Sequence, residues 1–226
     1  MQGSETSMSE PETEEYFRRE AMGAFAHEVR TPLTSIRMVM ELGRRQSTGG
    51  QLVLDRELAN MLSTSVDDLQ RLADDLQEAS RLERGKLAIG TGPCDLAAAI
   101  AAANDLILPR ICIECRPPVG VEGAWDAARL VRSVAGFAES ANRMGDGSGL
   151  VRLRVKSEVP QAAVALHFES GVRGPDLRPI AADAGFSYFR SRLFVLAMGG
   201  TVTCLRSERH ATISVRIPYA PRRGRD

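Results

Sequence analysis

The 226 residues carry 29 basic and 29 acidic side chains, so the formal net charge is zero, and 43% of the residues are apolar. A chain of this composition can bury a packed core, and its length suits one large domain or two small ones. The balanced charge creates no overall positive field, so we expect neither nucleic acid nor an anionic membrane as a partner.

No apolar run is long enough to cross a bilayer, because the longest, LAAAIAAA at 96–103, is followed at once by polar residues. The first residues, MQGSETSMSEPETEE, are acidic and polar, whereas a secretion signal has a basic segment followed by an apolar one. We therefore expect a cytoplasmic protein, with disordered tails at residues 1–13 and 221–226.

Apolar residues recur every three or four positions between residues 14 and 45, which is the period of an amphipathic helix. Pro32 lies within this run and removes a backbone donor, so we expect a local kink just beyond His27. The predicted apolar stripe consists of Phe25, Val29, Leu33, Ile36 and Met40.

A glycine-rich turn, QSTGGQ at 46–51, separates this helix from a second periodic run between Leu54 and Ala79. The two runs predict an antiparallel helical hairpin over residues 14–89. Because two helices bury too little apolar surface alone, we expect a homodimer in which two hairpins form a four-helix bundle.

The pattern changes after a glycine- and proline-containing linker at 90–93. Alternating apolar residues predict strands at 150–155, 163–168 and 211–217, and helix-spaced ones predict helices at 126–144 and 187–198. Residues 94–220 are therefore predicted to form an α/β sandwich with helices on one face of the sheet.

The four cysteines are too few for a disulfide framework in a chain of this length. Cys112 and Cys115 form a single Cys-x-x-Cys pair within a strand-like run, RICIECRPP. That spacing on a strand points the two thiols to opposite faces, so we predict buried, reduced cysteines and no metal site on this chain.

His27 lies two positions after the core residue Phe25, a rotation of about 200° on a helix, so it faces water. Arg30 and Thr31 follow on the same ridge. The carboxylate of Glu28 can hydrogen-bond one ring nitrogen, which leaves the other unprotonated and nucleophilic. These residues together fit a phosphoryl acceptor, whereas an isolated exposed histidine is usually an ordinary surface residue.

The stretch FAHEVRTPL at 25–33 resembles the phosphoacceptor box of sensor histidine kinases, in which the histidine precedes glutamate, a hydrophobe, arginine, threonine, proline and leucine. SRLERGKL at 80–87 resembles the end of that family's second dimerisation helix. The resemblance implies that His27 is phosphorylated and that Glu28 and Thr31 position water when a partner is dephosphorylated. The implied partner is a response-regulator receiver domain.

The order of elements in residues 94–219 resembles the ATP-binding domain of the same family, but its asparagine helix departs from the family pattern. Gly136 and Ser140 stand at the positions of two asparagines, of which the second is a magnesium ligand in functional kinases. Ser140 is a weaker ligand and Gly136 offers none.

The two glycine boxes also depart from the family pattern. In HFESGVRG the first box has Glu169 for its adenine-reading aspartate, keeps Gly171, and has Arg173 in place of its second glycine. Gly185 follows 14 positions after Gly171, where the family has a much longer lid, and Ser187 replaces the second glycine of the next box. Bare backbone holds the triphosphate there in the family, and side chains obstruct that approach.

These departures coincide at one pocket, while the phosphoacceptor box is complete. We therefore predict an α plus α/β protein, with a dimeric helical hairpin followed by a sandwich of the histidine-kinase ATPase type. It resembles the kinase-like histidine phosphotransferases of bacterial phosphorelays. His27, helped by Arg30, would exchange a phosphoryl group with receiver aspartates, the receiver supplying magnesium and no ATP being bound.

Two related activities and one function of another class remain as alternatives. The same surface serves a response-regulator phosphatase that acts through Glu28 and Thr31. A sensor histidine kinase with a shortened ATP lid would also carry this hairpin. In the third alternative, the chain is a non-catalytic binding module and His27 is idle.

Overall fold

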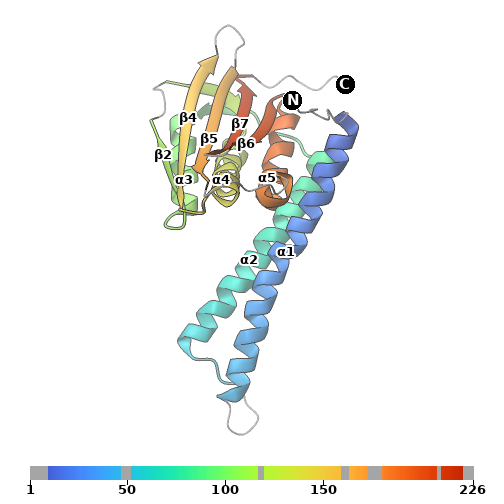
Figure 1. Ribbon diagram of the computed structural model, residues 1–226, viewed down its shortest axis with the longest axis vertical. Coiled ribbons are helices and arrows are strands. Elements are labelled where there is room, and N and C mark those ends of the chain that lie inside the picture. The colour runs from blue at the N-terminus through green and yellow to red at the C-terminus, as the bar shows by residue number, and fades with distance from the viewer. Residues whose placement is uncertain are drawn as a thin grey trace, which may run out of the picture.

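A helical hairpin and a sheet-containing domain make up the molecule (Figure 1). The hairpin consists of α1 (Glu10–Arg45) and α2 (Arg56–Glu83), and the second domain packs against one end of it. This confirms the predicted fold class, an α-helical hairpin followed by an α/β domain. The computed structural model describes residues 10–46, 52–116, 120–158, 163–172, 180–207 and 210–220.

The hairpin helices differ from the sequence prediction mainly at their ends. Helix α1 starts at Glu10, inside the segment predicted as a disordered tail, and continues through Pro32. Helix α2 starts after Asp55, whose carboxylate accepts a hydrogen bond of 2.8 Å from the backbone N–H of Leu58. Most of the predicted glycine-rich turn lies outside the described residues. Among the described residues, no helix has both the length and the apolarity required to cross a bilayer.

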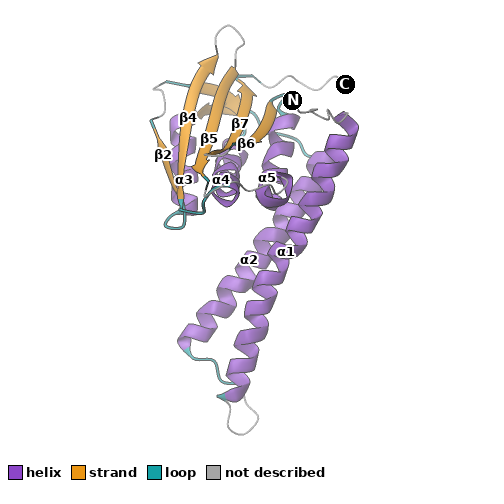
Figure 2. Cartoon of the chain, viewed as in Figure 1, coloured by secondary structure: helices purple, strands orange, loops and turns teal. Residues whose placement is uncertain are grey.

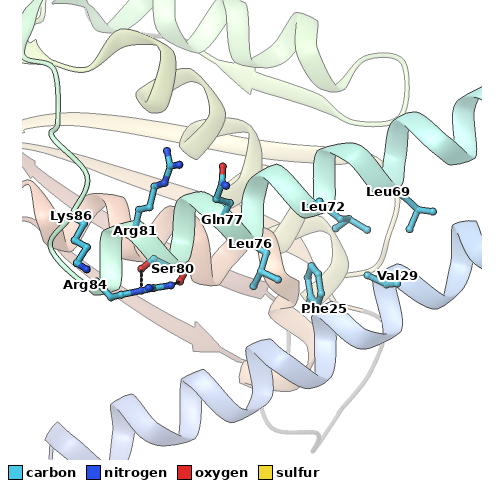
Figure 3. Close-up of a pocket in the computed structure, with 11 residues that line it drawn as sticks. Phe25, Val29, Leu69, Leu72, Leu76, Gln77, Ser80, Arg81, Arg84 and Lys86 are labelled. Atoms are coloured by element: carbon cyan, nitrogen blue, oxygen red, sulfur yellow. Dashed lines mark hydrogen bonds between the residues drawn. The ribbon is translucent and has the colours of Figure 1, made fainter.

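The apolar faces of α1 and α2 leave an open groove between them, which we call the hairpin groove (Figure 3). Its volume is about 790 Å³. Its apolar lining comes from both helices, and polar side chains close one end. The apolar lining residues are Phe25, Val29, Leu69, Leu72, Ala73 and Leu76.

The second domain is built on a mixed sheet of strand order β2-β4-β5-β7-β6, in which only β2 and β4 run parallel. Strands β1 and β3 form a separate antiparallel pair. Figure 2 shows α3, α4 and α5 on one face of the large sheet. The elements are β1 (Gly92–Asp95), α3 (Leu96–Ile107), β2 (Cys112–Cys115), β3 (Glu122–Trp125), α4 (Ala127–Met144), β4 (Leu150–Glu158), β5 (Ala163–Gly171), α5 (Ile180–Ala197), β6 (Thr201–Arg206) and β7 (His210–Pro218).

A single apolar core runs from the sheet through α4 and α5 into the hairpin. Phe137 of α4 packs on Phe168 of β5, with ring centroids 5.7 Å apart. At the other end, Phe186 of α5 packs edge-on against Phe25 of α1, with ring centroids 5.0 Å apart. The second domain therefore docks on the hairpin through packed side chains.

The cysteines are free thiols, as predicted, but they are not all buried. Cys112 is exposed on the edge strand β2, Cys115 is half-buried, and burial raises the pKa of the Cys115 thiol. Among the strands that the structure describes, β4 is the one neighbour of β2, which places β2 at the edge of the sheet. No cluster of metal-ligating side chains occurs within the described ranges.

Candidate phosphoacceptor site

His27 lies on the solvent-facing side of α1, as its rotation from Phe25 predicts. Arg30 and Thr31 are also exposed and follow it along the same ridge. Thr34 donates a hydrogen bond of 2.8 Å to the backbone carbonyl of Arg30, one turn away. The ring of His27 is therefore accessible to a docking partner.

The ridge borders a cleft of about 940 Å³ between the hairpin and the second domain. From α1 it is lined by His27, Glu28 and Thr31, and from the second domain by Arg143 and Ser187, among others. Both domains thus contribute to the surroundings of the candidate acceptor.

The Glu28 carboxylate does not hydrogen-bond the His27 ring, contrary to the sequence prediction. Its Oε1 accepts a hydrogen bond of 2.5 Å from Nη1 of Arg143 and one of 3.3 Å from the backbone N–H of Phe186. Neighbouring helical residues point in directions about 100° apart, and a guanidinium is a stronger donor than a neutral ring. The second domain therefore holds the carboxylate that the sequence assigns to His27.

A glycine makes this contact sterically possible. Gly185 has φ of +79°, within the left-handed region, and interrupts α5 just before Phe186. A Cβ atom at this position would clash with the guanidinium of Arg143 and lie 2.9 Å from Oε1 of Glu28. Only glycine leaves room here for both groups.

The two positions that resemble the asparagine pair lie in the packed contact between α4 and α5. A Cβ atom on Gly136 would lie 2.6 Å from Oγ of Ser191, so this site has no space for a side chain. Ser140 is 1% exposed, and its hydroxyl donates to the carbonyl of Gly136 at 2.7 Å. Neither residue presents a ligand to the cleft.

The second glycine box is part of the core. Phe186, Ser187 and Tyr188 are all buried, and Tyr188 packs edge-on against Phe137. Burial raises the pKa of Tyr188. The Ser187 hydroxyl donates to Oε2 of Glu139 at 3.2 Å. The box thus packs into the core through Phe186 and Tyr188, while Ser187 also borders the cleft beside His27.

The first glycine box lies apart from these residues. Alternate residues of a strand face opposite sides, and Phe168 faces the helices, so Glu169 lies on the other face of the sheet. There it forms an ion pair with Arg154 of β4. A Cβ atom on Gly171 would lie 3.1 Å from Oδ2 of Asp146, and Arg173 falls outside the described residues. Glu169, which stands at the position of the family's aspartate, is thus on the face away from α4 and α5.

Sequence reasoning missed the charged residues that join the two domains. The Asp75 carboxylate of α2 accepts hydrogen bonds from Arg132 of α4 and, at 2.7 Å, from Arg190 of α5. Glu78, one turn further along α2, accepts a hydrogen bond of 2.7 Å from Arg129. One signal was available, because Asp75 interrupts the apolar stripe of α2. No pattern in the sequence predicts that Arg143 contacts the hairpin.

The hairpin matches the His Kinase A (phospho-acceptor) domain over residues 17–85. Two curated relatives are similar to the chain. The probable sensor histidine kinase TcrY of Mycobacterium tuberculosis is 27% identical over 88% of this chain and 46% of its own length. The signal transduction histidine-protein kinase BaeS of Escherichia coli is 27% identical over 63% of this chain and 31% of its own length. The chain thus spans less than half the length of either relative.

Solved histidine kinases share the fold. The Acinetobacter baumannii histidine kinase AdeS aligns with a TM-score of 0.68 at 18% identity, covering 85% of this chain and 98% of that one. Histidine kinase ThkA, solved in complex with response regulator protein TrrA, aligns with a TM-score of 0.58 at 17% identity. The alignment covers 96% of this chain and 69% of that one. Residues 17–85 thus match a His Kinase A (phospho-acceptor) domain, and the chain as a whole is similar to sensor histidine kinases in sequence and fold.

Proposed function

We propose that this protein is a histidine phosphotransferase of a phosphorelay, which exchanges a phosphoryl group between His27 and receiver-domain aspartates without using ATP. The observation that carries the proposal is a contrast between the two domains. His27 is exposed on a complete phosphoacceptor box, whereas Gly136, Ser140 and Ser187, which stand at nucleotide-site positions of the family, are buried in the second domain.

The chemistry requires little from the chain beyond an accessible ring nitrogen. Its lone pair forms a bond to the phosphorus of the aspartyl phosphate, while the bond from phosphorus to the aspartate oxygen breaks and its electron pair leaves with the carboxylate. Positioning and charge neutralisation supply most of the catalysis in such transfers. The exposed guanidinium of Arg30 can contribute to charge neutralisation, and the receiver would bring the magnesium.

A receiver domain as partner is supported by the ThkA neighbour, which was solved with the response regulator protein TrrA. The cleft beside His27 offers both a basic and an acidic lining for such a partner, because Arg71, Arg110 and Arg143 lie there together with Glu20 and Asp68.

Three positions argue against ATP as the phosphoryl donor. Gly136 has no space for the asparagine of the family, the hydroxyl of Ser140 is used within its own helix, and Ser187 is bonded to Glu139. The family's asparagine could stand at Gly136 only if α5 moved away from α4, because a Cβ atom there would lie 2.6 Å from Oγ of Ser191. Such a displacement would open the apolar core.

A histidine kinase with a shortened lid is the second candidate. The relatives TcrY and BaeS carry the name of kinases, and the structural neighbour ShkA, solved in complex with AMPPNP, aligns with a TM-score of 0.57. That candidate would have to bind ATP without the family's asparagine side chains at Gly136 and Ser140.

The test is to mix the purified protein with phosphorylated receivers, in the absence of ATP, and to follow acid-labile label onto the chain. We expect label on the wild-type protein and none on His27→Gln, because glutamine has no nucleophilic ring nitrogen. His210→Gln, which alters an exposed histidine of β7, is the matched control and should accept label normally.

Two results would contradict the proposal. Incorporation of the γ-phosphate of ATP into the protein alone would establish the kinase. Failure of the wild-type protein to accept label from every receiver tested would leave a binding module whose His27 is idle.

A further inference from the structure

The second domain makes its contact with the phosphoacceptor helix at the residue next to His27. The Arg143 guanidinium and the Phe186 backbone N–H both donate to Oε1 of Glu28, at 2.5 and 3.3 Å. The Glu28 side chain is only 17% exposed, although it lies on the helix that carries the solvent-facing acceptor. The second domain therefore contacts the acceptor region directly.

The contact is held by rigid elements. An isolated ion pair at a protein surface contributes little, because ordering two long side chains costs entropy. Here α5 is fixed to α1 by the edge-on contact between Phe186 and Phe25, and to α2 by the buried pair of Arg190 and Asp75. Arg143 lies on α4, which packs against α5 in the shared core and is joined to α2 by the ion pairs of Glu78, so it is presented to Glu28 at a fixed place.

The two donors use the same carboxylate oxygen. Both converge on Oε1, and no described residue donates a hydrogen bond to Oε2 of Glu28. A carboxylate anchored through one oxygen has a fixed plane, and its second oxygen can accept a hydrogen bond from water in a defined direction. His27 and Thr31 line the same cleft.

We infer that Arg143 is a positioning residue for hydrolysis of the receiver's aspartyl phosphate: by anchoring Oε1 of Glu28, it directs Oε2 to the attacking water. This inference rests on the proposed function and gives the second domain a task that needs no nucleotide. The water oxygen forms a bond to phosphorus, and the bond from phosphorus to the aspartate oxygen breaks. Its electron pair leaves with the receiver carboxylate, and the water proton passes through Oε2 to solvent.

The inference separates two reactions at one site. Transfer to His27 uses the lone pair of the ring nitrogen and does not depend on the orientation of Glu28. Hydrolysis does depend on it. Loss of Arg143 should therefore slow the release of inorganic phosphate and leave the labelling of His27 in place.

The experiment measures both reactions on the full chain with one phosphorylated receiver. We expect Arg143→Ala to lower phosphate release, in excess of the receiver's own hydrolysis, by about 10-fold or more, since small misplacements of catalytic groups have effects of that size. Labelling of His27 should change by less than about twofold, a size typical of substitutions outside the reacting groups. Arg143→Lys should restore part of the release, because it keeps a cationic donor.

Two further variants exclude a general loss of docking. In the double variant Glu28→Gln/Arg143→Ala, release should equal that of Glu28→Gln alone if Arg143 acts through Glu28. A further loss in the double variant would overturn the inference. Arg152→Ala is the matched control, because Arg152 is an exposed arginine of the second domain that pairs with Glu114 at 3.2 Å on the sheet. It should leave both reactions unchanged.

The role of Arg143 and the proposed phosphotransferase function can be contradicted separately. If His27 is labelled but Arg143→Ala releases phosphate at the wild-type rate, or if the wild-type protein releases none, Arg143 has no positioning role and the transferase stands. If no receiver labels His27, the proposed function fails and the role of Arg143 falls with it.

Discussion

Asp75 is a buried carboxylate at the junction of three helices. Its side chain is 4% exposed, and it receives hydrogen bonds from Arg132 and Arg190. Desolvation lowers the pKa of Arg190, whose side chain is 9% exposed, and the negative charge of Asp75 opposes that shift. The carboxylate therefore compensates a guanidinium that water does not reach.

Substituting Asp75 should destabilise the whole chain. In Asp75→Ala the guanidinium of Arg190 stays buried without its counter-charge, and we expect the free energy of unfolding to fall by about 3–5 kcal/mol. Urea denaturation followed by circular dichroism measures it. Asp74→Ala is the control, because Asp74 is exposed and bonds only Gln70 of its own helix, so it should change stability by no more than about 0.5 kcal/mol. Equal losses in the two variants would contradict a buried ion pair.

Single residues differ in how far the sequence predicts them. The exposure of His27 follows from helical geometry alone, and the structure confirms it. The partner of Glu28 does not follow, because Arg143 lies 115 positions away and reaches Glu28 only once both domains have docked. A local pattern contains no information about such a pair. Glu169 was placed at the pocket by resemblance, whereas its strand register turns it to the other face.

The contact between α4 and α5 determines what the second domain can bind. Gly136 allows the two helices to approach, since Oγ of Ser191 and the carbonyl of Ser187 would lie 2.6 and 3.2 Å from an added Cβ atom. The family's asparagine at this position would meet both groups. The absence of a side chain at Gly136 therefore allows α4 and α5 to pack closely.

Reintroducing that asparagine should cost stability. We expect Gly136→Asn to lower the free energy of unfolding by about 1–3 kcal/mol, because overpacking forces α5 away from α4. Gly23→Ala is the matched helical control, because nothing lies within 4 Å of a Cβ atom at Gly23. It should raise stability by up to about 1 kcal/mol through helix propensity. Thermal denaturation compares the two, and an unchanged or higher midpoint in Gly136→Asn would contradict the packed contact.

Elements with a clear period were predicted, and those without one were missed. The predicted strands correspond to β4, β5 and β7, and the predicted helix at 126–144 to α4. Strands β1 and β3 have four residues each, too few for a period, and they form only by pairing with each other. Helix α3 was read only as an apolar run, because alanine fills both its buried and its exposed faces.

The whole molecule exposes apolar surface that a single chain does not cover. In Figure 3 the side chains of Phe25 and Val29 on α1 face those of Leu69, Leu72 and Leu76 on α2 across the hairpin groove. Two helices alone do not close such a groove, and a second copy of the hairpin offers a matching apolar face. The homodimer stays a prediction on this basis.

A charge in the hairpin groove should separate the two copies. We expect the wild-type chain to sediment as a dimer and Leu69→Glu to sediment as a monomer, because the groove would have to bury an unpaired carboxylate. Analytical ultracentrifugation distinguishes them. Leu205→Glu, which alters a residue of β6 that is 67% exposed, should remain dimeric. A monomeric wild-type chain would contradict the dimer.

The docking of the two domains is the part of the molecule that the sequence did not predict at all. It depends on side chains from α1, α2, α4 and α5, each of which looks ordinary within its own segment. The joint core contains Ala21 and Leu82 of the hairpin beside Phe186 and Phe194 of α5. Such a contact follows from the assembled surfaces and not from any local period.

Gly185 shows what a retained glycine does and does not reveal. A glycine with φ of +79° permits close approach, but it does not determine which group approaches. In this chain the groups that approach Gly185 are the carboxylate of Glu28 and the guanidinium of Arg143. A glycine that resembles part of a nucleotide-binding box can thus serve as a joint between two domains. Such a glycine is therefore not by itself a sign that a chain binds ATP.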